Sequence, residues 1–172
     1  MSSAICQRRT PTFREHREVL QESLVAVAQE SFFSFAEPCD TERFGEAVSS
    51  AEADASGSVL RWLRACVEFE GAFAGRVSVT MPHALAVELM MAIAGLAPED
   101  EIAEGHVIDS TGEFANMVCG TWLTKAAVHR KFNLRPPAVT SVGAPVERAA
   151  DGEELVLIND RPVSLRLDFI AS

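Results

Sequence analysis

The chain of 172 residues has little positive charge and no long apolar run. Lys and Arg number 15 against 25 Asp and Glu, which gives a formal net charge of −10. Because nucleic acid and anionic membranes are bound through clustered cations, we expect neither to be the main partner. No apolar stretch approaches the roughly 18 residues needed to cross a bilayer. The first residues, MSSAICQRRTPTF, also lack the apolar core of a secretory signal.

Paired cysteines and clustered histidines are missing as well. The four cysteines are Cys6, Cys39, Cys66 and Cys119, and the four histidines are His16, His83, His106 and His129. No two cysteines form a C-x-x-C pair, and no histidine stands at metal-ligand spacing from another histidine or a cysteine. We therefore expect no bound metal or cofactor, which makes a metal enzyme the weakest candidate. Dispersed thiols without an export signal are typical of a reducing cytoplasm, where we expect this protein.

The apolar content of 48% is enough for one domain with a core. Residues 1–13 are expected to be a flexible lead-in, and residues 14–172 a single domain. Apolar spacing predicts a long helix from Phe13 to Ala36, which Pro38 ends. The following segment, residues 38–58, is polar, small and acidic, and we interpret it as a loop or a weak strand.

The middle of the chain predicts a β-hairpin followed by a helix. Alternating residues around Val67 and Val77 indicate two strands, joined by a hairpin loop over Gly71–Gly75. Pro82 is expected to open the next helix and Gly95 to close it. The acidic loop LAPEDEIAEGH then follows, either as a solvated connection or as a rim that helps to select a partner.

The last third predicts another long helix, ended by Asn133–Pro137, and then three strands, PAVTSV, ELVLIND and VSLRLDFI. The order of elements predicts an α+β fold. We expect a single domain in which long helices pack on one side of an antiparallel sheet, built from two pseudo-repeats.

One face of the last long helix, DSTGEFANMVCGTWLTKA, carries unusual residues for an exposed surface. At about 100° per residue, the apolar side chains share one side. The other side holds Asp109, Glu113, Asn116 and Gly120. Asn and Gly are poor helix formers, and Gly costs about 1 kcal/mol relative to Ala. The face is therefore either an ordinary solvated surface or a place that another surface approaches closely.

The pattern D-x-x-x-E-x-x-N-M-x-x-G, formed by Asp109, Glu113, Asn116, Met117 and Gly120, resembles the signature helix of the CheX-type chemotaxis phosphatases. These belong to the wider CheC, CheX and FliY family. Weaker similarity runs from about residue 60 to residue 169. The resemblance implies a CheC-like fold and hydrolysis of the aspartyl phosphate on a CheY-like receiver protein.

The resemblance also implies roles for the residues on this face. Asn116 would position the attacking water, and Glu113 would dock a lysine of the receiver, so these two are the predicted catalytic residues. Asp109 and Gly120 would belong to the docking surface. The Mg²⁺ would be held by the receiver and not by this chain. In the first long helix, Glu22 and Glu30 have no asparagine three residues later, so we expect one site.

Two further points stay open at the level of sequence. The same fold could instead be a non-catalytic module that binds a receiver or a component of the flagellar switch. The family resemblance also implies a homodimer joined through sheet edges, and the alternating strand VSLRLDFI could lie at such an edge or in mid-sheet.

Overall fold

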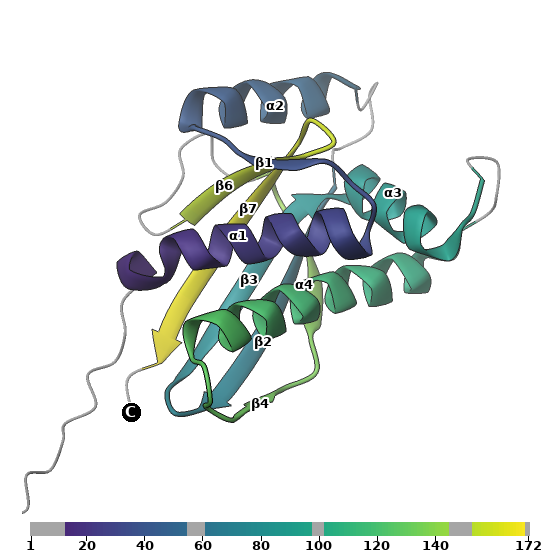
Figure 1. The fold of residues 1–172 in the computed structure, drawn as a ribbon. Helices are drawn as coiled ribbons and strands as arrows, with labels where there is room; N and C mark the ends of the chain where they lie inside the picture. The colour runs from purple at the N-terminus through teal and green to yellow at the C-terminus, as the bar shows by residue number, and fades with distance from the viewer. Residues whose placement is uncertain (1–12, 55–60, 98–101, 145–152, 171–172) are drawn as a thin grey trace, which may run out of the picture.

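A computed structural model of the chain describes residues 13–54, 61–97, 102–144 and 153–170 (Figure 1). The predicted lead-in, residues 1–13, lies outside this part of the chain except for its last residue. The helices and strands are α1 (Phe13–Ser31), β1 (Ala36–Pro38), α2 (Thr41–Asp54), β2 (Trp62–Gly71), β3 (Ala74–Pro82), α3 (His83–Ala94), α4 (Glu104–Ala126), β4 (Phe132–Leu134), β5 (Ala138–Val142), β6 (Glu153–Ile158) and β7 (Arg161–Ile170). None of the helices in the described ranges has the length and apolar content that a membrane crossing requires.

The strands form one antiparallel sheet in the order β1-β6-β7-β3-β2, and β4 and β5 both pair with the outer side of β2. The hairpins β2–β3 and β6–β7 meet in the middle of the sheet, where Val77 of β3 lies opposite Leu167 of β7. This confirms the predicted α+β fold with an antiparallel sheet. The order is compatible with two pseudo-repeats, which remain a prediction.

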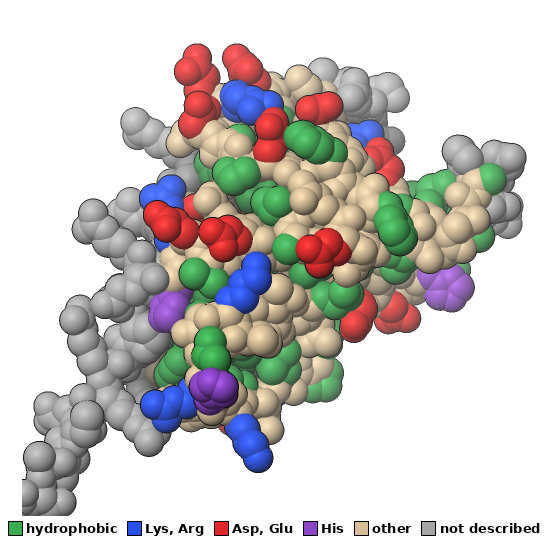
Figure 2. Space-filling view, in the orientation of Figure 1, with side chains coloured by type: hydrophobic (Ala, Val, Ile, Leu, Met, Phe, Trp, Pro, Cys, Tyr) green, Lys and Arg blue, Asp and Glu red, His purple; other side chains and the backbone are tan. Residues whose placement is uncertain are grey.

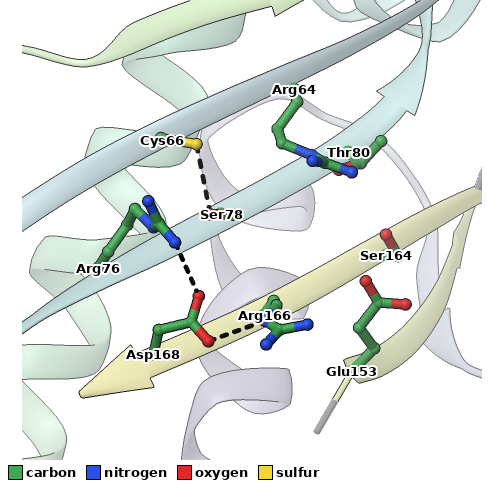
Figure 3. Close-up of a pocket in the computed structure, with 9 residues that line it drawn as sticks. All are labelled: Arg64, Cys66, Arg76, Ser78, Thr80, Glu153, Ser164, Arg166 and Asp168. Carbon is green, nitrogen blue, oxygen red and sulfur yellow. Dashed lines mark hydrogen bonds and ion pairs between the residues drawn. The ribbon is translucent and has the colours of Figure 1, made fainter. Parts of the chain in front are cut away.

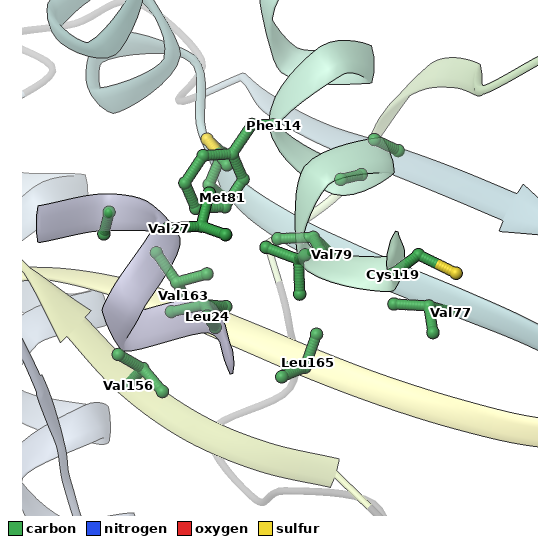
Figure 4. Close-up of a cluster of buried hydrophobic side chains, with 14 of the residues drawn as sticks. Leu24, Val27, Val77, Val79, Met81, Phe114, Cys119, Val156, Val163 and Leu165 are labelled. Carbon is green, nitrogen blue, oxygen red and sulfur yellow. The ribbon is translucent and has the colours of Figure 1, made fainter. Parts of the chain in front are cut away.

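The long helices α1 and α4 lie side by side across one face of the sheet, as predicted (Figure 1). Alternate residues of the central strands turn to that face, among them Val79 and Leu165, and pack with Leu24 of α1 (Figure 4). The rings of Phe32 and Phe114 join the two helices, with centroids 4.9 Å apart. Each of these side chains is at most 1% exposed, so the burial of this face supplies the main core.

The predicted boundaries of α3 are confirmed. Pro82 is the residue just before the helix, with φ −59°, where its missing N–H costs no hydrogen bond. Gly95 follows the last turn with φ 64°, a left-handed conformation that glycine adopts without steric cost, and its N–H donates to the carbonyl of Met91.

The first long helix is shorter than predicted. It ends at Ser31, because the backbone turns at Phe33, with φ 52°, and the N–H of Ser34 donates to the carbonyl of Ala28. Pro38 therefore does not end the helix but closes strand β1, which pairs with β6 at one end of the sheet. The apolar spacing continued past Ser31, which is why the sequence predicted a longer helix.

The interpretation of residues 38–58 as a loop or weak strand was wrong, because α2 occupies most of them. Asp40 begins this helix by accepting a hydrogen bond from the N–H of Arg43, at 2.9 Å. Phe44 and Val48, one turn apart, pack against Trp62 on the sheet face away from α1 and α4. The small polar residues around Phe44 and Val48 obscure the helical period in the sequence.

The end of the last long helix was also predicted too late. α4 ends at Ala126, and part of the expected terminator, Asn133–Pro137, belongs to strand β4.

Strand β7, which contains the sequence VSLRLDFI, lies between β6 and β3 and is therefore in the middle of the sheet and not at its edge. The outer strands of the sheet are β1 at one end and β4 with β5 at the other.

An ion pair between the exposed Arg17 and the buried Glu154 joins α1 to the sheet. Glu154 of β6 is 1% exposed, and its Oε1 lies 2.5 Å from Nε of Arg17 on α1. Its Oε2 has no hydrogen-bond partner among the described residues. Burial raises the pKa of Glu154, and the pairing with Arg17 opposes this rise without cancelling it.

We expect Glu154→Gln to gain stability relative to the parent protein as the pH rises from about 4 to about 7. A carboxyl group with a raised pKa stabilises the fold below its unfolded pKa and loses that contribution as the pH rises through its folded pKa. The amide has no proton to lose and escapes this cost. Urea unfolding at both pH values measures the difference, with the exposed Glu46→Gln as control. A difference between variant and parent that does not change with pH would contradict the prediction.

Candidate functional site

The two sides of α4 differ sharply in exposure. Phe114, Val118 and Trp122 are 0% exposed and face the core. On the opposite side, Glu113 is exposed and Asn116 is half-buried, three residues apart and therefore neighbours on the helix surface. The predicted division of the helix into a core side and a polar side is confirmed.

Three polar side chains on this side of α4 are unpaired within the part of the chain that the structure describes. The side chains of Asp109, Glu113 and Asn116 make no hydrogen bond or ion pair with any residue that the structure describes. A carboxamide offers both a donor and an acceptor, and an ionised carboxylate offers acceptors only. The arrangement can thus hold a water or a polar group with Asn116 and attract a cation with Glu113.

Two glycines of α4 have opposite surroundings. A Cβ built on Gly120 would have nothing within 4 Å, so the helix surface is open there. A Cβ on Gly112 would lie 3.0 Å from Cγ and 3.3 Å from Cβ of Pro137. Gly112 therefore lets α4 approach the start of β5, a packing role that the sequence did not indicate. Gly120 has no such close neighbour, so the helix surface beside Asn116 is open.

A shallow hollow of about 430 Å³ begins at Gly120 and runs to the connection between α4 and β4. Arg130 and Lys131 line it together with Phe132. Figure 2 shows basic side chains near the lower left of the molecule, below the C-terminal end of α4 in Figure 1. The basic pair in the sequence HRKF, residues 129–132, is the signal that could have predicted this lining.

Cys119 is not a candidate nucleophile. It is 0% exposed, and burial raises the pKa of its thiol to about 12, so the reactive thiolate is not formed near neutral pH. Within the described ranges, no three His, Cys, Asp or Glu residues lie close enough together to hold a metal ion. The predicted site residues of α4 offer the amide of Asn116 and the carboxylates of Asp109 and Glu113.

The family model described as chemotaxis phosphatase CheX matches residues 63–158, which is more than half of the chain and includes all four candidate residues. This chain belongs to the CheX family. A comparison with curated proteins gives no match.

Solved structures of CheX-like proteins share the fold. The chemotaxis protein CheX of Vibrio vulnificus superposes with a TM-score of 0.65 at 18% identity, over 94% of this chain and 100% of that chain. A putative chemotaxis protein of Desulfovibrio vulgaris Hildenborough gives 0.63 at 17% identity, over 91% and 97%. A CheC-like superfamily protein of Shewanella sp. PV-4 gives 0.57 at 19% identity, over 91% and 98%. At these identities the likeness concerns the fold.

Only one of the two long helices carries the E-x-x-N pair. In α1, Glu22 is exposed but is followed three residues later by the half-buried Val25, and Glu30 by Phe33. Of these two helices, α4 is therefore the one in which a glutamate and an asparagine stand three residues apart.

Proposed function

We propose that this CheX-family protein hydrolyses the aspartyl phosphate of a CheY-like receiver domain. The observation that supports this most directly is the outer side of α4. There Asn116 and Glu113 have no partners among the described residues, and Gly120 leaves the adjoining surface open. A protein surface can approach such a helix closely and meet polar groups that are free to bind it.

In the proposed reaction the receiver contributes the phosphorylated aspartate and the Mg²⁺ beside it. An acyl phosphate is already reactive, so the remaining task is to hold a water in line with the bond that breaks. Asn116 performs that task with its amide. The water oxygen forms a bond to phosphorus, the bond between phosphorus and the aspartate oxygen breaks, and the water proton passes to solvent or phosphate. The products are the free aspartate and inorganic phosphate.

Glu113 is proposed to bind a lysine of the receiver and so to fix α4 over the phosphoryl group, with Asp109 extending the acidic side. A carboxylate that is not already paired suits this role, because it can accept an ammonium group without first breaking another ion pair. A charged hydrogen bond of this kind is strong and directional. A homodimer joined through sheet edges cannot pair through β7, since both edges of that strand are already paired. We propose β1 or the β4–β5 side as the joint.

The direct test is phosphate release from a phosphorylated receiver in the presence of Mg²⁺, with and without this protein. Acceleration well above the receiver's own rate is expected. Receivers from the same source should be assayed in parallel, with receiver binding measured separately. Binding without acceleration would overturn the phosphatase proposal and favour a docking module for a receiver or a flagellar-switch component.

We expect Glu113→Gln to raise KM about two- to fivefold at low ionic strength and to leave kcat nearly unchanged. The variant loses a charge that attracts the receiver, but the amide of Asn116 still holds the water. Because salt screens exposed charges, the difference should shrink at higher salt. Steady-state kinetics at two salt concentrations measures it, with Glu22→Gln on α1 as the matched control. A fall in kcat at constant KM would instead give Glu113 a part in the chemical step.

A further inference from the structure

On the sheet face away from α1 and α4, long polar side chains surround short ones and enclose a hollow of about 330 Å³ (Figure 3). It is lined by Arg64, Cys66, Arg76, Ser78, Thr80, Glu153, Ser164, Arg166 and Asp168. Its volume falls at the lower end of the range of roughly 300–1,000 Å³ for small-molecule sites.

The register of the central strands explains why these residues gather. Across the sheet, Arg64 lies opposite Thr80, which in turn lies opposite Ser164. In the next row Ser78 lies opposite Arg166. Residues two apart on one strand share a face, and neighbouring strands are only about 4.8 Å apart, so all these side chains point to the same side. The short hydroxyl residues form the floor, and the arginines rise around it.

The floor of the hollow is buried although no long helix packs over it. Ser78 is 8% exposed, and Thr80 and Ser164 are each 3% exposed. The hydroxyl of Ser78 lies 3.3 Å from Sγ of Cys66. A polar sheet face that is merely solvated would leave such short residues accessible, so these hydroxyls line a recess.

One carboxylate holds two of the arginines in place. Oδ2 of Asp168 accepts a hydrogen bond from Arg76 at 3.2 Å, and its Oδ1 accepts one from Arg166 at 2.8 Å. Burial opposes ionisation of Asp168, but the two guanidinium groups outweigh it and lower the pKa of the carboxyl group. Both arginines are therefore fixed beside the hollow with donors left over, because each guanidinium has five N–H groups.

Arg64 supplies charge that is not compensated. Its Nε donates to Oγ1 of Thr80 at 3.1 Å, and it has no ion pair with a carboxylate among the described residues. The hollow is lined by three arginines against the two carboxylates of Glu153 and Asp168. A positive site in a chain of net charge −10 runs against the overall composition.

We propose that this hollow binds a phosphate group, either as inorganic phosphate or as the ester of a small molecule. Guanidinium groups match the oxygens of a phosphate in pairs, and hydroxyl groups add donors at the floor. Arg64 provides the charge, Arg166 a second guanidinium, and Ser164 and Thr80 the hydroxyls.

The hollow and the proposed receiver-binding side of α4 lie on opposite faces of the sheet and share no residue. Binding in the hollow therefore does not depend on the phosphatase proposal. Asn116→Ala should keep the anion site intact.

The test is calorimetric titration of the parent protein at low salt with inorganic phosphate and, separately, with glycerol 3-phosphate. We expect saturable binding of at least one probe at a single site. Arg64→Gln should weaken it roughly tenfold or more. The matched control is Arg43→Gln, which removes an arginine of α2 that is paired with Glu37 outside the hollow. Added sodium chloride should weaken binding in the parent, since the attraction is largely electrostatic.

A preference for the ester would assign the site to a phosphorylated small molecule, and equal or tighter binding of phosphate would assign it to the free ion. No saturation by either probe up to about 10 mM would overturn the proposal. Binding that Arg64→Gln leaves unchanged would overturn it as well, provided that the melting temperature shows the variant to be folded. Arg64 is exposed and forms no ion pair with a carboxylate that the structure describes, so its replacement should not affect folding.

Discussion

Asn116→Ala is expected to lower phosphate release from a phosphorylated CheY-like receiver by roughly 10²–10³-fold while leaving receiver binding nearly unchanged. The size of the effect follows from what the amide does in the proposed reaction. It orients one water, and a misplaced water attacks in line only rarely. Because the amide makes no hydrogen bond with described residues of its own chain, its loss should not disturb the fold.

The measurement separates chemistry from docking. Phosphate release gives the rate, and titration of the variant with a receiver gives the affinity. Asn116→Gln retains the amide but moves it by one methylene, so it should also be slow if position matters. Lys125→Ala, on the same helix but away from the predicted site residues, is the control and should keep its activity. Equal loss of rate and affinity in Asn116→Ala would make the residue a docking contact, and an undiminished rate would remove it from the site.

The sequence could predict those elements whose pattern is local. The αL glycine at Gly95 and the proline at Pro82 defined α3 without tertiary information, because each acts through its own backbone. The polar side of α4 could likewise be derived from the helical period, since burial of Phe114 and Trp122 determines which residues face outward. Both features can be predicted from residues that lie within a few helical turns of one another.

The features that were missed depend on contacts between distant segments. α2 is stabilised as a helix because Phe44 and Val48 pack with Trp62 and Leu155 on the second face of the sheet. The sequence of residues 41–54 alone does not indicate that this face exists. The hollow lined by arginines arises from the register of β2, β3 and β7, which brings together residues as distant in sequence as Arg64 and Asp168. Neither could be expected from composition.

Gly120→Leu is expected to fold as well as the parent protein but to lose receiver binding and phosphate release by tenfold or more. Leucine is a better helix former than glycine by roughly 0.8 kcal/mol, and the space around Gly120 is empty, so unfolding should cost the same or slightly more free energy. The added side chain instead occupies the space that the receiver would fill in the proposed complex. Urea unfolding and a binding titration with a receiver measure the two effects.

Gly112→Leu provides the opposite result on the same helix. Its first added carbon would already crowd Pro137 at 3.0 Å, and the rest of the side chain would push α4 away from β5. Overpacking of this kind typically costs about 1–3 kcal/mol of stability. The same substitution should thus disturb folding at Gly112 and docking at Gly120. If Gly120→Leu bound and dephosphorylated receivers normally, the outer side of α4 would not be the docking surface. The roles proposed for Asn116 and Glu113 would then fail with it.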